Sequence, residues 1–266
     1  MGTDYVHGYT DSETRRLSDQ ADTLAELLHG GTQYPPGSRV LEVGCGVGAQ
    51  TVQLLTRSPG IALTAVDISE DSLAEAKRRV AARAPYGQVE WHHGDLHGLP
   101  YGEFDHLFVC FVLEHLPDPV DALRTLRNHL RPGGTITVVE GDHGSAIYHP
   151  RSDDAQAVIE CLNRSQADAG GDALIGRRVQ PLLTAAGFTE VVTEPRTVYA
   201  DQTVPHLVDG FTRKTFIAMV GSVRDRSIAT GLSTPDAWAR GIRDLERTAE
   251  PGGTFHYTFF KGVGVR

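Results

Sequence analysis

Residues 40–49 read VLEVGCGVGA, a short apolar run followed by three glycines at alternate positions. This pattern is typical of a strand that turns sharply into a helix, because glycine adopts the backbone conformations such a turn requires. The first N–H groups of the helix would point at any ligand lying over the turn. Gly44-x-Gly46-x-x-Ala49 also satisfies the dinucleotide-binding fingerprint, and glycine-rich turns occur without ligands, so this stretch alone leaves the ligand open.

Strands and helices alternate after this turn. Further strands are expected at 61–66, 89–92, 104–111 and 135–139, with helices between them. The almost wholly apolar run 104–111 is typical of a strand covered on both faces. The alternation predicts an α/β fold with a doubly wound, parallel sheet.

Helical segments are expected on both sides of this region. An N-terminal helix is predicted over 10–28, where Thr10 and Glu13 form a candidate capping box. Residues 141–150 are expected to be an irregular loop. Beyond it the expected elements are helices at 153–167 and 176–186, a strand at 190–199, helices at 204–230 and 235–248, and a last strand at 254–260. The resulting division is an N-terminal helical lid (1–38), a core (39–200), a helical insert over the substrate site (201–250) and the last strand of the core sheet (251–266).

Composition excludes several classes of protein. The 266 residues carry a formal net charge of −9 with only short basic clusters, which disfavours a nucleic-acid partner. No apolar stretch is long enough to span a membrane and residues 1–10 are polar, so we expect a cytoplasmic protein. Three widely spaced cysteines indicate neither a disulfide framework nor a metal site. The sequence does not indicate the oligomeric state.

Three features favour S-adenosylmethionine (SAM) over a dinucleotide. Glu42 lies two residues before Gly44, where an anion is unfavourable beside a pyrophosphate but suits a ligand carrying an ammonium and a sulfonium group. Asp95 follows the third strand, where its carboxylate could accept a hydrogen bond from an adenine amino group. The fourth strand leads into FVLEHLPD at 111–118, and LRPGG follows at 130–134.

This order of motifs resembles the class I SAM-dependent methyltransferases, in the branch of the ubiquinone/menaquinone-biosynthesis and small-molecule enzymes. The resemblance covers about 40–140. It implies a Rossmann-like, seven-stranded sheet with an antiparallel last strand. It also implies SAM as cofactor, S-adenosylhomocysteine as its product, and a small-molecule acceptor, such as a quinone-like molecule or a secondary metabolite, methylated on O, N or C. The cofactor residues that it implies are Glu42, Gly44, Cys45 and Gly46 at the methionine end, Asp67 on the ribose hydroxyls, Ile68, Asp95 and Leu96 around the adenine, and the backbone near Phe111 at the methionine portion.

The acceptor is expected beside residues 140–150, because ligands of such sheets lie at the carboxyl ends of the strands. This segment holds two acids, two histidines and a tyrosine. His143, or else His149, could act as a general base or orient the acceptor. The alternative is that these side chains only hydrogen-bond the backbone of their own loop. No metal-ligand spacing is present.

Two flanking segments are further candidates. The N-terminal helix could close over the cofactor, with Tyr9 contacting SAM and Arg16 pairing with its carboxylate; the alternative is a plain surface segment. Aromatic residues of the insert region could line an apolar acceptor pocket or simply belong to the core; these are Tyr199, Phe211, Phe216 and Trp238. Two other functions stay open: an NAD(P)-dependent oxidoreductase, against which Glu42 and Asp95 argue, and a SAM-binding protein that does not methylate.

Overall fold

The computed structural model describes residues 16, 20–96, 98–99 and 102–266. Seven strands form one sheet in the order β3-β2-β1-β4-β5-β7-β6. Their bounds are β1 Arg39–Val43, β2 Ala62–Asp67, β3 Gln88–His93, β4 Phe104–Cys110, β5 Leu130–His149, β6 Thr189–Ala200 and β7 Thr254–Val265. Strands β1 to β5 pair in parallel, and β7 runs antiparallel to both β5 and β6. The predicted Rossmann-like α/β sheet with an antiparallel last strand is therefore confirmed.

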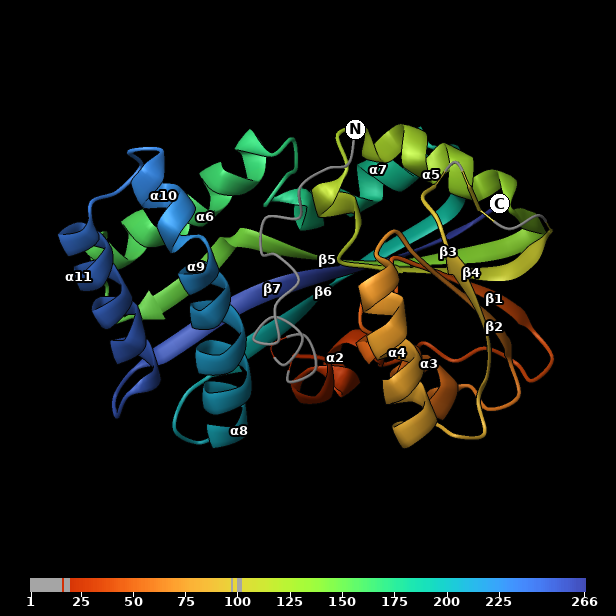
Figure 1. Ribbon diagram of the computed structural model, residues 1–266, viewed down its shortest axis with the longest axis horizontal. Coiled ribbons are helices and arrows are strands. Elements are labelled where there is room, and N and C mark those ends of the chain that lie inside the picture. The colour runs from red at the N-terminus through yellow and green to blue at the C-terminus, as the bar shows by residue number, and fades with distance from the viewer. Residues whose placement is uncertain (1–15, 17–19, 97, 100–101) are drawn as a thin grey trace.

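Helices cover both faces of the sheet (Figure 1). One face carries α5 (Pro119–Asn128) and α7 (Val179–Ala185), and the other carries α2 (Ala25–His29), α3 (Ala49–Arg57) and α4 (Glu70–Arg83). Successive residues of β1 point to opposite faces, as the pleat requires. Val40 packs in a cluster with Leu28 and Val52, whereas Leu41 packs in another with Leu123. The apolar runs of the parallel strands thus fill two cores at once.

Several helix starts follow from the local sequence. Ser69, Asp118, Ser152 and Thr234 each accept a hydrogen bond from the backbone N–H three residues later. Proline occupies the first turn after Asp118 and Thr234, where its missing N–H costs nothing. Serine and threonine at 69 and 234 are residue types that cap helices, so these starts are encoded locally.

The expected loop at 141–150 is wrong, because β5 continues through it to His149. Pairing with β7 runs from Thr135 opposite Val265 to His149 opposite Thr254, with a register shift between Asp142 and Ile147. The glycines and polar residues of this stretch have no alternating apolar pattern, so the local sequence predicts a loop. Backbone hydrogen bonds to the partner strand β7 hold the stretch in an extended conformation instead.

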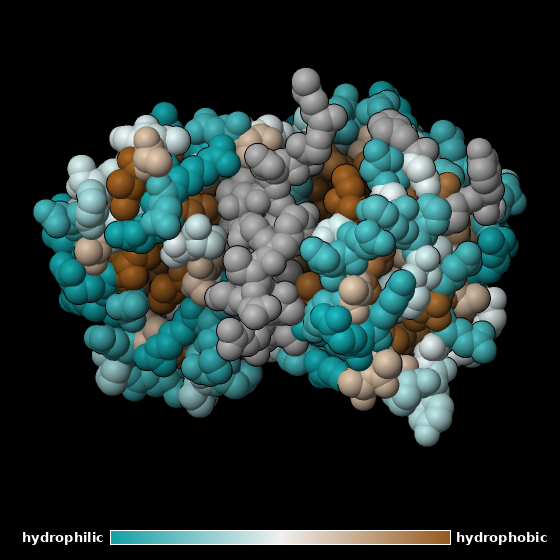
Figure 2. All heavy atoms as spheres, viewed as in Figure 1, coloured by the Kyte–Doolittle hydropathy of each residue, from teal (hydrophilic) through white to brown (hydrophobic). Residues whose placement is uncertain are grey.

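Apart from α7, the helices beyond β5 gather around this extension (Figure 1). They are α6 (Asp153–Asp168), η2 (Ile175–Arg178), α8 (Pro205–Leu207), η3 (Val208–Ile217), α9 (Ala218–Ser222), α10 (Arg224–Ala229), α11 (Pro235–Glu246) and η4 (Arg247–Ala249). Most of them lie between β6 and β7 in the chain, where the helical insert was predicted. The surface seen in Figure 2 is mainly hydrophilic on the helices, with hydrophobic residues visible between them. Within the described ranges, no helix has the length and apolar character needed to cross a membrane.

The segment η3 is a π-helix of ten residues, a rare conformation that is enriched at functional sites. A Cβ atom on its Gly210 would lie 2.2 Å from the Thr23 hydroxyl oxygen, so only glycine permits this approach to the N-terminal helical segment. Thr10, Glu13 and Tyr9, on which the predicted capping box and lid depend, lie outside the described residues.

Candidate functional site

A cavity of about 930 Å³ lies over the carboxyl ends of the central strands. Its lining includes residues that directly follow β1, β2, β3 and β4, together with Gly141 and His143 in β5. This is the edge of a doubly wound sheet at which ligands bind. Ten of the predicted cofactor-binding and catalytic residues line it: Arg16, Gly44, Cys45, Gly46, Asp67, Ile68, Asp95, Leu96, Phe111 and His143.

The glycine-rich turn forms one wall of the cavity. Gly44, Gly46 and Gly48 have φ angles of 68°, 51° and 76°, a region that favours glycine. A Cβ on Gly48 would lie 2.8 Å from the Ala76 Cα in α4, so glycine also allows α3 to begin close to α4. A Cβ on Gly46 would meet nothing within 4 Å. The space over the middle of the turn is therefore open to a ligand.

Asp67 connects this turn to the start of α4. Its Oδ2 accepts a hydrogen bond from the Gly46 N–H at 2.7 Å, and its Oδ1 accepts one from the Ser69 N–H at 2.8 Å. Burial raises the pKa of this carboxyl, and these backbone hydrogen bonds act in the opposite direction. The adjacent Ile68 is 56% exposed, an unusual state for isoleucine, and offers an apolar surface to the cavity.

Asp95 and Leu96 follow β3 in the chain and also line the cavity. The Asp95 Oδ1 accepts a hydrogen bond from the Gly98 N–H at 3.0 Å, which closes a tight turn. Asp95 is exposed and Leu96 is half-buried. The turn thus presents a carboxylate and an apolar side chain together.

Glu42 is not among the residues that line the cavity. It is 2% exposed, and its Oε2 accepts a hydrogen bond from the Thr51 hydroxyl at 2.7 Å. Burial raises the pKa of Glu42 to about 8, so the side chain is mainly neutral at pH 7. The structure therefore places Glu42 between β1 and α3 as a buried carboxyl rather than as a surface for a ligand.

The backbone after β4 turns sharply at Phe111. This residue has a φ angle of 59°, which is rare for a residue with a side chain and is often found at functional sites. Glu140 holds the next residues, because its Oε1 accepts hydrogen bonds from the N–H groups of Val112 and Leu113 at 3.0 and 2.8 Å. Burial and the nearby Glu114 raise the pKa of Glu140 well above its ordinary value. Sequence reasoning missed this role, although Glu140 is the first acid after the apolar run of β5.

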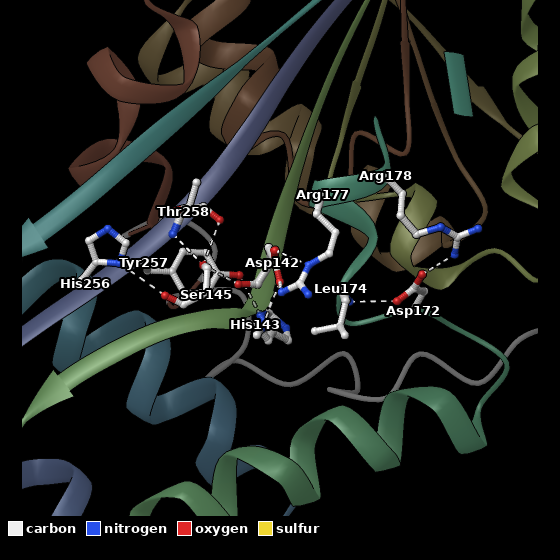
Figure 3. A network of polar contacts seen from close by, with 11 residues as sticks. Asp142, His143, Ser145, Asp172, Leu174, Arg177, Arg178, His256, Tyr257 and Thr258 are labelled. Atoms are coloured by element: carbon white, nitrogen blue, oxygen red, sulfur yellow. Dashed lines mark hydrogen bonds and ion pairs between the residues drawn. The ribbon is translucent and has the colours of Figure 1, made fainter. Parts of the chain in front are cut away.

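His143 and Tyr257 form a buried pair at the other end of the cavity (Figure 3). The His143 Nδ1 lies 2.7 Å from the Tyr257 hydroxyl oxygen, and the exposed fractions of the two residues are 5% and 2%. Burial lowers the pKa of His143 and raises that of Tyr257 well above 10. Next to them, Arg177 donates two hydrogen bonds to the Asp142 carboxylate at 2.7 and 2.8 Å, which fixes the register shift in β5.

The remaining predicted residues lie in different places. Arg16 is buried at the cavity and donates to the Gln20 side-chain oxygen at 3.2 Å. His149 is exposed near the end of β5 and does not line the cavity. Tyr9 lies outside the described residues. Burial raises the pKa of Cys45 and of Cys110, so both are protonated thiols that pack rather than react.

Four aromatic side chains form an apolar wall beside His143, called here the aromatic wall: Phe211 and Phe216 from η3, and Tyr257 and Phe259 from β7. Ring centroids of Phe216 and Tyr257 lie 5.6 Å apart, and those of Tyr257 and Phe259 lie 4.8 Å apart. Tyr257 and Phe259 share one face of β7 because residues two apart in a strand do so. Of the other aromatic candidates, Tyr199 is 52% exposed and Trp238 is buried in the core, and neither lines the cavity.

Among the described residues, no cluster of histidine, cysteine, aspartate and glutamate is arranged to hold a metal ion.

Comparisons with known proteins agree with this geometry. A methyltransferase domain family matches residues 41–136. Trans-aconitate 2-methyltransferase of Deinococcus radiodurans is 32% identical over 192 residues, which cover 71% of this chain and 66% of that protein. The ubiquinone/menaquinone biosynthesis C-methyltransferase UbiE of Paracoccus denitrificans is 29% identical over 149 residues, covering 51% and 58%. The chain thus spans less than two thirds of the length of either relative.

A solved structure shows the same fold at low identity. Phosphoethanolamine N-methyltransferase 2 of Haemonchus contortus, in complex with phosphomonomethylethanolamine and S-adenosylhomocysteine, superimposes with a TM-score of 0.59 and 16% identity. The alignment covers 97% of this chain and 58% of that one. Because the family match includes the glycine-rich turn and the sheet has the order described above, the chain belongs to the class I SAM-dependent methyltransferases, of the UbiE-like type.

Proposed function

We propose that this protein binds SAM and transfers its methyl group to an oxygen, nitrogen or carbon nucleophile of a small molecule. The observation that carries the proposal is the single cavity, which runs from the glycine-rich turn and Asp67 to His143 and the aromatic wall. One end has the polar groups that a nucleoside needs, and the other combines the aromatic wall with the buried His143–Tyr257 pair.

The cavity fits the cofactor at several points. Asp67 would accept hydrogen bonds from the ribose hydroxyls, Ile68 and Leu96 would pack on the adenine, and Asp95 would accept from its amino group. The open backbone at Gly46 and the strained turn at Phe111 would meet the methionine portion, and the guanidinium of Arg16 would bind its carboxylate. The bound cofactor supplies an electrophilic methyl group on a sulfonium.

The protein contributes alignment and exclusion of water. The aromatic wall surrounds the acceptor end with side chains that do not compete for the methyl group, and His143 offers one polar contact there. The curated relatives named above include enzymes of small acids and quinone precursors, as their names state. A small acceptor is therefore favoured over nucleic acid for this acidic chain.

Isothermal titration of the protein with SAM, S-adenosylhomocysteine and NADH tests the cofactor. Micromolar binding of the first two without binding of NADH would support the proposal. Transfer from methyl-labelled SAM to a panel of hydroxy, carboxylic, amine and activated-carbon compounds would then test the reaction. Binding of NADH in place of SAM would favour an oxidoreductase, and SAM binding with no transfer to any class would favour a non-methylating role.

A further inference from the structure

The hydrogen bonds of the Tyr257 hydroxyl determine which nitrogen of His143 carries its proton. A hydroxyl has one proton to donate and two lone pairs to accept. A backbone hydrogen bond from Asp142 reaches the Tyr257 oxygen, and the His143 Nδ1 lies 2.7 Å from it. In the part of the chain that the structure describes, Nδ1 is the acceptor available to the hydroxyl proton. Tyr257 therefore donates to Nδ1.

The opposite arrangement loses a hydrogen bond. If Nδ1 carried the proton and donated to Tyr257, the buried hydroxyl proton would face no acceptor among the described residues. Buried polar groups without partners are rare because each one costs free energy. Both groups are also neutral near pH 7, since burial lowers the pKa of His143 and raises that of Tyr257. The neutral imidazole consequently carries its proton on Nε2.

This Nε2 is itself a buried polar atom in need of a partner. It is inaccessible and has no hydrogen-bond partner among the described residues, while the imidazole belongs to the lining of the cavity. The ring also meets Phe216 edge to face, at 6.3 Å between centroids and an interplanar angle of 84°. Beside the aromatic wall, His143 thus offers an N–H donor that no described residue uses.

We propose that Tyr257 is a positioning residue that holds His143 as an Nε2–H donor, so that the methyl acceptor binds through an oxygen lone pair at this nitrogen. The inference rests on the proposed function and narrows the acceptor to an apolar molecule with a carbonyl, carboxylate or phenolate oxygen. A neutral amine has a single lone pair, which must attack the methyl group and so cannot also accept from Nε2–H, and a protonated amine has none. Since Nε2 already carries its proton, His143 stabilises an oxygen that is already anionic or carbonyl-like and does not remove a proton from it.

The tautomer can be read directly from the protein without any ligand. Long-range proton–nitrogen correlation spectra of ¹⁵N-histidine-labelled protein at pH 7 distinguish the Nε2–H form, the Nδ1–H form and the imidazolium, and His143→Asn assigns the signal. We expect the Nε2–H form in the wild type and its loss, or a mixture of tautomers, in Tyr257→Phe. The matched control is Tyr148→Phe. Tyr148 lies in the same strand as His143, but its hydroxyl donates to Ser152 and Gln156, so its removal should leave the spectrum unchanged. An Nδ1–H or imidazolium form in the wild type, or an unchanged tautomer in Tyr257→Phe, would overturn the proposal.

Probes of matched shape test the acceptor class. In the presence of S-adenosylhomocysteine, cinnamate and cinnamaldehyde should shift the Nε2–H signal of His143, and cinnamylamine should not. A shift with the amine alone, or none with any of the three, would contradict the assignment of an oxygen acceptor. Failure of SAM to bind in the calorimeter would defeat the proposed function but leave the ligand-free tautomer result standing, so the two failures are distinguishable.

Discussion

Replacement of Glu42 by glutamine should change how stability depends on pH. Glu42 is 2% exposed, its carboxyl accepts a hydrogen bond from the Thr51 hydroxyl, and its pKa is raised to about 8 by burial. In the unfolded chain the same carboxyl titrates near its ordinary value of about 4.5. Between these two pH values the wild-type protein must therefore take up a proton at Glu42 when it folds.

The sign and size follow from proton linkage. The stability that the neutral Glu42 contributes is fully present below about pH 4.5 and is lost as the pH rises toward 8, because the unfolded state ionises first. Each pH unit in this window costs the wild type about 1.4 kcal/mol relative to a residue that does not titrate. From pH 5 to pH 8, the unfolding free energy of Glu42→Gln should therefore rise by about 4 kcal/mol relative to that of the wild type. We expect the variant to be less stable at pH 5 by about 1 kcal/mol, because its amide N–H groups lack acceptors, and more stable at pH 8.

Urea denaturation followed by circular dichroism at pH 5, 6, 7 and 8 measures this difference. Glu90→Gln, on the exposed side of β3, controls for the loss of one carboxylate from an acidic chain. If the difference between Glu42→Gln and wild type stayed constant within about 1 kcal/mol over this range, Glu42 would be ionised throughout, and the argument from burial would be refuted.

Three further changes test other parts of the site. Asp67→Ala should weaken SAM binding about 10- to 100-fold in calorimetry, because the complex loses charge-assisted hydrogen bonds. His143→Ala should change the affinity for SAM less than about threefold. The reverse order of the two effects would refute the site assignment. Glu140→Ala should lower the unfolding free energy by about 2–6 kcal/mol, since two backbone N–H groups lose their acceptor, and Glu140→Gln by less than about 2 kcal/mol; equal losses in urea titrations would mean that the hydrogen bonds are not what matters. Gly48→Ala should lower the unfolding free energy by about 2–4 kcal/mol in the same assay, because residue 48 has a φ of 76° and its Cβ would contact the α4 backbone. The control is Gly221→Ala, in a helix where a Cβ meets nothing within 4 Å. A loss for Gly48→Ala no larger than that of the control would contradict the packing argument.

The cofactor half of the molecule could be predicted from sequence because its signals are local. Glycines at 44, 46 and 48 need their positive φ angles within one turn, and Asp67 follows its own strand directly. Apolar runs of the parallel strands and the caps at Ser69 and Thr234 depend on neighbours a few residues away. Here the local pattern and the final structure agree, so the prediction of fold and cavity edge succeeded.

The acceptor half could not be predicted in the same way, because its order comes from contacts between distant segments. His143 lies in a stretch that resembles a loop, yet β7 converts that stretch into a strand and brings Tyr257 to its Nδ1 across 114 residues of sequence. The π-helical form of η3 has no pattern of its own in the sequence, although it sets Phe211 and Phe216 into the aromatic wall. Both strands of this half are long, so the sheet itself extends past the cofactor region and carries the acceptor groups on rigid strands rather than on a mobile loop. Specificity in this protein should therefore change by substitution in β7 and η3, where partners of His143 lie, sooner than by substitution in the glycine-rich turn.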